Sequence, residues 1–139
     1  MYLVDTNVVS EARKAHRADH GVQAFFARVV EDESSLYLSV VTVGELRRGV
    51  ELIRHRGDEL QSKLLEDWLE GTLAEYGDCV LDFDAEMAQV WGRLRVPQPQ
   101  NALDKQIAAT ALIHDLIVVT RNVEDFADTG VRLLNPFSA

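Results

Sequence analysis

Four acidic residues, Asp5, Glu45, Asp104 and Asp125, stand near the points where strand-like segments of the sequence give way to helix-like ones. No histidine or cysteine lies beside any of them, so the donor set consists of oxygen atoms alone. Oxygen ligands favour hard divalent cations such as Mg²⁺ and Mn²⁺. Such a cation commonly serves phosphoryl chemistry, where it activates water and offsets the negative charge that grows on phosphate.

The segments that carry these acids predict an α/β fold. Short apolar or β-branched runs favour strands, at residues 2–4, 36–41, 80–83, 116–119 and 131–134. Apolar residues at helical spacing fill the intervals between these runs. Strands separated by helices form βαβ units, so we expect a three-layer α/β/α fold with a central parallel sheet of about five strands, the first one central. The length of 139 residues predicts a single domain over 1–139.

Each acid also has a purely structural explanation. Asp5 is a possible helix N-cap, Thr42 with Glu45 matches a capping box, Asp104 suits a first helical turn, and Asn122 with Asp125 suggests another cap. Taken together, the acids favour a different interpretation. The carboxyl ends of parallel strands meet at one edge of a sheet. Like-charged carboxylates about 4 Å apart in a partly shielded site repel by a few kcal/mol per pair. Either the acids point apart as separate caps, or a divalent cation lies between them.

The charge distribution qualifies the acidic composition. A net charge of −9 argues against a nucleic-acid partner. Residues 57–86 alone carry that excess, with ten acids against one base, and the rest of the chain is neutral, with 13 acids and 13 bases. Two basic residues beside the acidic segments, Lys105 and Arg121, are the preferred candidates for phosphate contacts. A solvated or ion-paired surface is the alternative for each of them.

Four sequence blocks resemble a known family. MYLVDTNVVSE, SVVTVGELRRGV, ALDKQIAATALIHDL and VVTRNVEDF are similar to the signature blocks of PIN-domain ribonucleases, and more narrowly of the VapC-type toxins of bacterial toxin–antitoxin systems. The resemblance runs from Met1 to the Asn135-Pro136-Phe137 segment, with the blocks in the family's order. The Pro-rich segment 96–101 replaces a longer glycine-containing stretch of the family, which changes the expected rim of the site.

The resemblance implies a Mg²⁺- or Mn²⁺-dependent endoribonuclease that hydrolyses phosphodiester bonds in tRNA or rRNA. It assigns metal binding and catalysis to Asp5, Glu45 and Asp104. Asp125 is taken as the fourth acid, because some family members have an aspartate where this chain has Asn122 and others have Asn there with Asp three residues later. Residues expected to orient these carboxylates or to contact substrate are Thr6, Asn7, Thr120, Arg121, Asn122 and Lys105.

The resemblance also implies partners. A toxin nuclease requires a cognate VapB-type antitoxin that covers the acidic pocket, and the same resemblance implies a homodimer and binding to operator DNA only through the antitoxin. The single cysteine, Cys79, excludes an internal disulfide, and the N-terminus lacks a basic region followed by a long apolar stretch. We therefore expect a cytoplasmic protein without membrane contact.

Two other classes of protein remain open at this point. A receiver-like signalling domain also gathers acids at the edge of a parallel sheet, but it requires an acidic pair after the first strand, where Asp5 stands alone, and a lysine where this chain has Arg121. The other class is a catalytically inactive PIN-fold binding module that acts with a partner protein. Assays of RNA cleavage distinguish that module from a nuclease.

Overall fold

The computed structural model describes residues 1–138 and contains a five-stranded parallel sheet. Its strands are β1 (Tyr2–Val4), β2 (Leu36–Ser39), β3 (Val80–Leu81), β4 (Ile117–Val119) and β5 (Leu133–Leu134). They are arranged in the order β3-β2-β1-β4-β5, and every neighbouring pair is parallel. The central position of β1 and the parallel sheet confirm the α/β/α fold predicted from the alternating apolar patterns.

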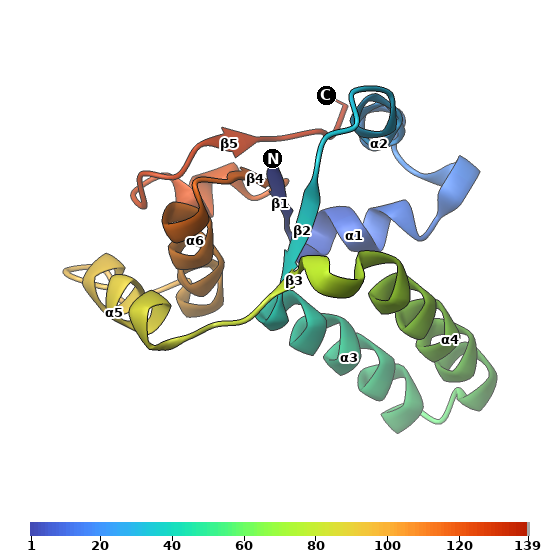
Figure 1. Cartoon of the computed structure of the whole chain (residues 1–139). Coiled ribbons are helices and arrows are strands. Elements are labelled where there is room, and N and C mark those ends of the chain that lie inside the picture. Colours follow the sequence, from blue (N-terminus) through green and yellow to red (C-terminus); the bar gives the residue numbers. More distant parts are fainter. Residues whose placement is uncertain (139) are drawn as a thin grey trace.

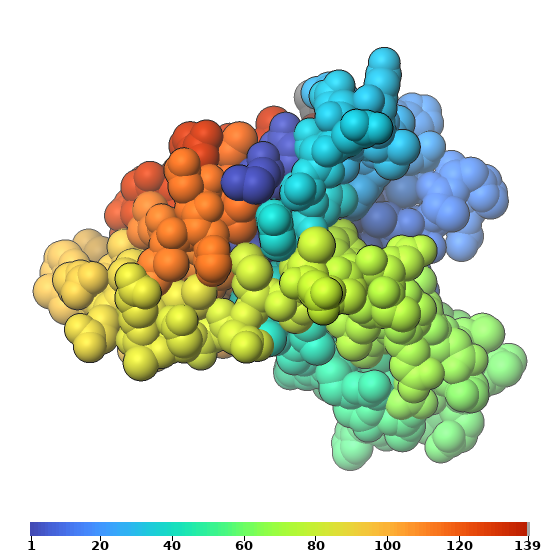
Figure 2. Space-filling model, viewed as in Figure 1, coloured from blue at the N-terminus to red at the C-terminus, as the bar shows by residue number. Residues whose placement is uncertain are grey.

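Six α-helices cover the two faces of the sheet. They are α1 (Thr6–Ala12), α2 (His20–Glu31), α3 (Val40–His55), α4 (Glu59–Tyr76), α5 (Ala85–Leu94) and α6 (Ala102–His114). Short 3₁₀ turns occupy Ala15–Arg17, Gly77–Cys79 and Val123–Phe126. Helices α1 to α4 lie on one side of the sheet and α5 with α6 on the other (Figure 1). In the space-filling view the α3–α4 pair (teal to green) lies at the lower right and the α5–α6 pair (yellow to orange) at the left (Figure 2).

The core consists of two apolar clusters, one on each face of the sheet. Successive residues of a strand point to opposite faces, and β1 illustrates this with Leu3 and Val4, both fully buried. Val4 packs in the cluster with residues of α1, α2, α3 and α4. Leu3 packs in the cluster with Ile107 and Ala108 of α6. Because β1 is buried on both faces, the position of the chain immediately after Val4 is fixed by packing on either side.

One helix start differs from the sequence-based expectation, and another has an unusual backbone conformation. The strand β2 ends earlier than predicted, and Ser39 caps α3 by accepting a hydrogen bond from the Val41 amide (3.1 Å). The Thr42–Glu45 capping box is therefore wrong, because both residues lie inside α3 and the Glu45 side chain is not needed for capping. Asn101 precedes α6 in a left-handed conformation (φ 59°), and its side chain makes no capping hydrogen bond. Asn tolerates this backbone region better than most residues.

Within residues 1–138, no helix combines the length and the apolar character needed to cross a lipid bilayer.

Candidate active site

Asp5 lies at the carboxyl end of the central strand, with only 3% of its surface exposed. Its Oδ1 atom accepts a hydrogen bond from the Thr6 amide (2.8 Å), so the residue does cap α1. Its Oδ2 atom accepts from the Thr120 hydroxyl (2.7 Å) and from the Asn7 side-chain amide (3.2 Å). An ionised carboxylate has about four acceptor positions. Three are used by the protein, which holds the carboxylate in one orientation and leaves acceptor capacity for a ligand.

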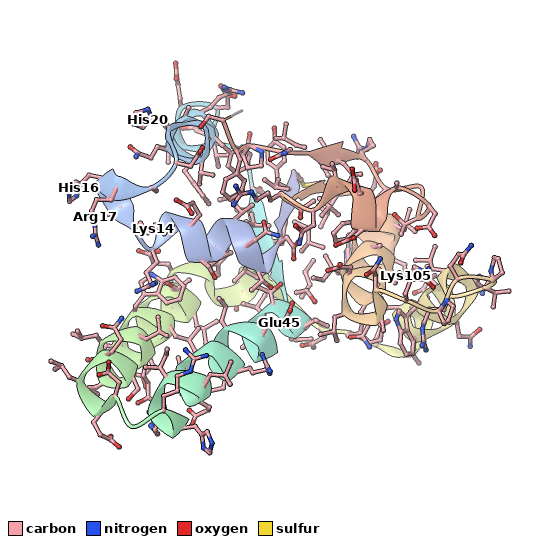
Figure 3. All side chains as sticks on the ribbon, turned by 180° about the vertical axis from the view of Figure 1, so that it is seen from behind. Lys14, His16, Arg17, His20, Glu45 and Lys105 are labelled. Atoms are coloured by element: carbon pink, nitrogen blue, oxygen red, sulfur yellow. The ribbon has the colours of Figure 1, made fainter. Side chains whose placement is uncertain are left out.

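Glu45 reaches the same region from α3 (Figure 3). Its Oε1 atom accepts a hydrogen bond from the Thr6 hydroxyl (2.9 Å). The Thr6 hydroxyl also approaches the hydroxyl of Thr42 at 3.3 Å. Thr6 therefore links two carboxylates, since its backbone amide binds Asp5 and its side chain binds Glu45. Asp5 and Glu45 are 40 positions apart in sequence, and both accept a hydrogen bond from the same threonine.

Electrostatic interactions connect Asp104 with the other three acids. Asp104 lies in the first turn of α6 and is partly buried. Desolvation, followed by the negative charges of Asp5, Asp125 and Glu45, raises the pKa of Asp104 to about 6. Burial also raises the pKa of Asp5, against the effect of its three hydrogen bonds, and the charge of Asp125 adds to that increase. Desolvation and the charge of Asp5 raise the pKa of Glu45. Asp104 thus lies within electrostatic range of the other three carboxylates, and Asp5 within range of Asp125 and Glu45.

The acids do not form a ready-made cage for a metal ion. Across residues 1–138, no group of three His, Cys, Asp or Glu side chains is close enough together to hold one cation. The donor chemistry nevertheless suits Mg²⁺ or Mn²⁺. Mg²⁺ is usually bound through one or two carboxylates, with water molecules completing the coordination. A divalent cation would also offset the mutual repulsion that raises the pKa of Asp104. The residues present therefore fit a water-rich site for a hard cation.

A hydrogen-bond network fixes the side chain of Thr120. The Asn7 side-chain amide (3.3 Å) and the Asn122 backbone amide (3.0 Å) both donate to the Thr120 hydroxyl oxygen. Because a hydroxyl carries one hydrogen, that hydrogen is directed to Asp5, at 2.7 Å. Asn7 in turn accepts a hydrogen bond from the Arg121 backbone amide (3.1 Å). Asn122 precedes the 3₁₀ turn that carries Asp125 without capping it through its side chain, so the proposed Asn122 side-chain cap is wrong.

The sequence of this chain matches a known protein family over nearly its whole length. The pattern of the PIN domain matches residues 2–131. The chain belongs to the PIN-domain family. Its relatives include toxin FitB of Neisseria gonorrhoeae strain ATCC 700825 / FA 1090, with 32% identity over 99% of each chain, and VapC ribonuclease Y4jK of Sinorhizobium fredii strain NBRC 101917 / NGR234, with 33% identity over 99% of this chain and 98% of the relative.

Two solved structures share both sequence and fold with this PIN domain. The FitAcB structure from Neisseria gonorrhoeae is 34% identical, covers 98% of each chain and has a TM-score of 0.84. The structure of FitAB bound to an IR36 DNA fragment is 30% identical, covers 100% of this chain and 97% of the other, and also has a TM-score of 0.84. Within the PIN family, the chain therefore belongs with the VapC and FitB toxins of toxin–antitoxin systems.

The structure of this PIN domain corrects one expected substrate contact. Lys105, next to Asp104 in sequence, is 1% exposed. Its ammonium group donates to the Gln98 carbonyl and lies 3.9 Å from the Asp128 carboxylate (Figure 3). The lysine therefore anchors the Pro-rich segment 96–101 to α6 and does not reach a phosphate in this conformation. Successive residues of a helix point in different directions, about 100° apart, which explains why neighbours in sequence separate here.

One basic residue that sequence reasoning overlooked lies beside the acids of the PIN domain. Arg13 lines a surface pocket of about 150 Å³ together with Thr6, Ser10 and Glu45. Thr6, Ser10 and Arg13 are spaced four and three residues apart, so they share one side of α1 and its continuation. This spacing is visible in the sequence, so Arg13 could have been predicted to lie on the same side of α1 as Thr6. Arg48, on the other side of Glu45, lines a groove of about 290 Å³ between α3 and α6.

Proposed function

We propose that this chain is the toxin of a VapBC-type toxin–antitoxin pair and acts as a Mg²⁺- or Mn²⁺-dependent endoribonuclease. Its substrate is tRNA or rRNA, whose phosphodiester bonds it hydrolyses to arrest translation and growth. The main observation in support is the pKa of Asp104, which desolvation and then the negative charges of Asp5, Asp125 and Glu45 raise to about 6. The relative named VapC ribonuclease, at 33% identity, supports the nuclease assignment.

In this proposal Asp5 and Asp104 are the principal metal ligands, with Glu45 and Asp125 completing the site through water molecules. The cation supplies Lewis-acid stabilisation of the phosphate charge and lowers the pKa of water. Thr120 and Asn7 orient the Asp5 carboxylate, and the hydrogen bonds that both donate oppose the increase in its pKa that burial causes. Thr6 fixes Glu45 in the same way. Water attack then leaves 5′-phosphate and 3′-hydroxyl ends, and no histidine is required.

The proposed partners follow from the same relatives. A VapB-type antitoxin covers the acidic site, and operator DNA is bound only through that antitoxin. The structures named FitAcB and FitAB bound to an IR36 DNA fragment support an antitoxin partner and its association with DNA. The toxin itself is proposed to be a homodimer that works in the cytoplasm without membrane contact.

Incubating the purified chain with total RNA tests the enzymatic proposal. We expect discrete cleavage products in Mn²⁺ or Mg²⁺ and none after EDTA is added, because the proposed reaction depends on the cation to activate water and offset the phosphate charge. Mapping the product ends identifies the bond and the RNA that is cut. If no RNA is cleaved under any metal condition, the chain is instead an inactive PIN-fold binding module, and the nuclease proposal is wrong.

A further inference from the structure

The last described residues, Asn135–Ser138, form a C-terminal strap that crosses from β5 to α2. The strap begins beside the proposed active site, because the Thr120 amide donates to the carbonyl of Leu134 at the end of β5 (3.0 Å). It ends at the start of α2, where Ser138 donates to Asp19 from its backbone amide (2.9 Å) and from its hydroxyl. The end of the chain lies next to α2 (Figure 1). The strap thus joins the site to a distant helix.

The attachment of the strap to α2 is specific. The Ser138 hydrogen bonds are the main reason that the pKa of Asp19 falls to about 2, so this carboxylate stays ionised at neutral pH. The strap also passes so close to Gly21 that an added Cβ atom would lie 2.2 Å from the Pro136 carbonyl oxygen. Only glycine allows this approach at residue 21. A larger residue there would displace the strap without replacing any residue of the proposed active site.

Between its two ends the strap contacts Arg121. The Phe137 ring lies 4.6 Å from the guanidinium carbon of Arg121, within the range of a cation–π interaction. Phe137 is itself fixed, because it packs against the core cluster and its amide donates to the Asn135 side chain (3.0 Å). The backbone of Arg121 is held by Asn7, which also binds Asp5. Arg121 is therefore restrained at its backbone by the site and at its charged end by the strap.

The restrained guanidinium is available to a ligand. Among the ion pairs within residues 1–138, none involves Arg121. By contrast, Arg47 and Arg54 both pair with Glu66. Arg121 also lines a surface cavity of about 230 Å³ together with Asp125. Arginine recognises phosphate strongly, and a side chain held in place loses less conformational entropy on binding.

We infer that Arg121 binds an RNA phosphate beside Asp125, and that the C-terminal strap positions it through Phe137. Phe137 is a positioning residue, since it acts through Arg121 and does not itself contact RNA. This inference rests on the proposed RNA substrate but not on cleavage. It concerns binding, which is measurable in EDTA where no bond is broken.

The test is the affinity for a short fluorescein-labelled single-stranded RNA, measured by anisotropy in EDTA at several salt concentrations. Arg121→Ala should weaken binding about tenfold and reduce the slope of log affinity against log salt by about 0.7, the value for one lost phosphate contact. Phe137→Leu, which keeps an apolar side chain but loses the ring face, should weaken binding about two- to fivefold. Phe137→Tyr, which keeps the ring, should bind within about twofold of the wild type.

Two glycine variants separate positioning from a general loss of structure. Gly21→Ala should weaken RNA binding about as much as Phe137→Leu, because the new methyl group displaces the strap. Gly71→Ala is the matched control, since nothing lies within 4 Å of a Cβ at that position of α4. It should leave RNA affinity unchanged.

A double-mutant cycle makes the inference falsifiable even if variants lose stability. In the Arg121→Ala background, adding Phe137→Leu should have no further effect on affinity. If Phe137→Leu weakens binding equally with and without Arg121, or if it leaves affinity unchanged, the strap does not position Arg121. Absence of any RNA binding by the wild type would also overturn the inference. RNA binding with the expected cycle but without cleavage in Mn²⁺ would refute the proposed nuclease and retain the strap.

Discussion

Replacing Asp5 with Asn is expected to reduce the rate of RNA cleavage about a thousandfold, while the protein remains folded. The neutral side chain keeps an oxygen for the Thr6 amide, so the start of α1 is preserved. It removes the negative charge of the most buried acid of the site. Losing about 4 kcal/mol of metal-dependent stabilisation of the transition state corresponds to this change in rate. The measurement is the single-turnover cleavage rate of a mapped RNA substrate in Mn²⁺.

Asp82→Asn is the matched control for that experiment. Asp82 is exposed on the connection between β3 and α5, so the same chemical change there should leave cleavage at the wild-type rate. Expression in a bacterium without the antitoxin gives a second measurement. Wild-type protein and Asp82→Asn should stop growth, whereas Asp5→Asn should not. Normal growth of cells that express the wild type would contradict the toxin assignment.

Replacing Asp104 with Asn should stabilise the metal-free protein at pH 8 and have a much smaller effect at pH 4. The pKa of Asp104 is about 6 in the folded protein, above its ordinary value of 3.8, so ionisation of this group opposes folding. The free-energy cost of ionising Asp104 in the folded protein is absent well below pH 4. It grows as the pH rises from about 4 to about 6 and is complete above about pH 6. Asn carries no charge, so the variant avoids this cost.

The expected gain at pH 8 is about 1–2 kcal/mol in the free energy of unfolding, reduced from the full pKa shift because Asp104 is partly exposed. This corresponds to an increase of several degrees in Tm. Thermal unfolding in EDTA at pH 4 and pH 8 measures it, with Asp82→Asn as the control for a simple change in net charge. Equal Tm values for wild type and Asp104→Asn at both pH values would mean that neither desolvation nor the neighbouring carboxylates oppose ionisation of Asp104.

Much of the fold was predictable because apolar patterns report burial directly. The strand that contains Leu3 and Val4 is apolar throughout, as expected of a central parallel strand with both faces covered. Its central position then determines where Asp5 emerges. The ends of elements were less predictable. Ser39 ends β2 by capping α3, and a serine beside threonine and valine residues gives the sequence several equally plausible starts for that helix.

The site was predictable in its acids and less so in its bases. Parallel strands must bring their carboxyl ends to one edge, so the positions of Asp5 and Glu45 follow from topology. The direction of a long basic side chain depends on packing that the sequence does not display. Lys105 turns into the protein because the Gln98 carbonyl accepts a hydrogen bond from its ammonium group and the Asp128 carboxylate attracts the positive charge. Neither partner is recognisable before the Pro-rich segment has been placed.

Direct titration with Mn²⁺ tests whether the four carboxylates together bind a divalent cation. Isothermal calorimetry on the wild type and on Asp5→Asn, Asp104→Asn and Asp82→Asn reports binding without requiring RNA or activity. We expect saturable binding by the wild type and by Asp82→Asn, and binding that is at least about tenfold weaker for the other two variants. Binding of equal strength in all four proteins, or no binding by the wild type, would contradict this expectation.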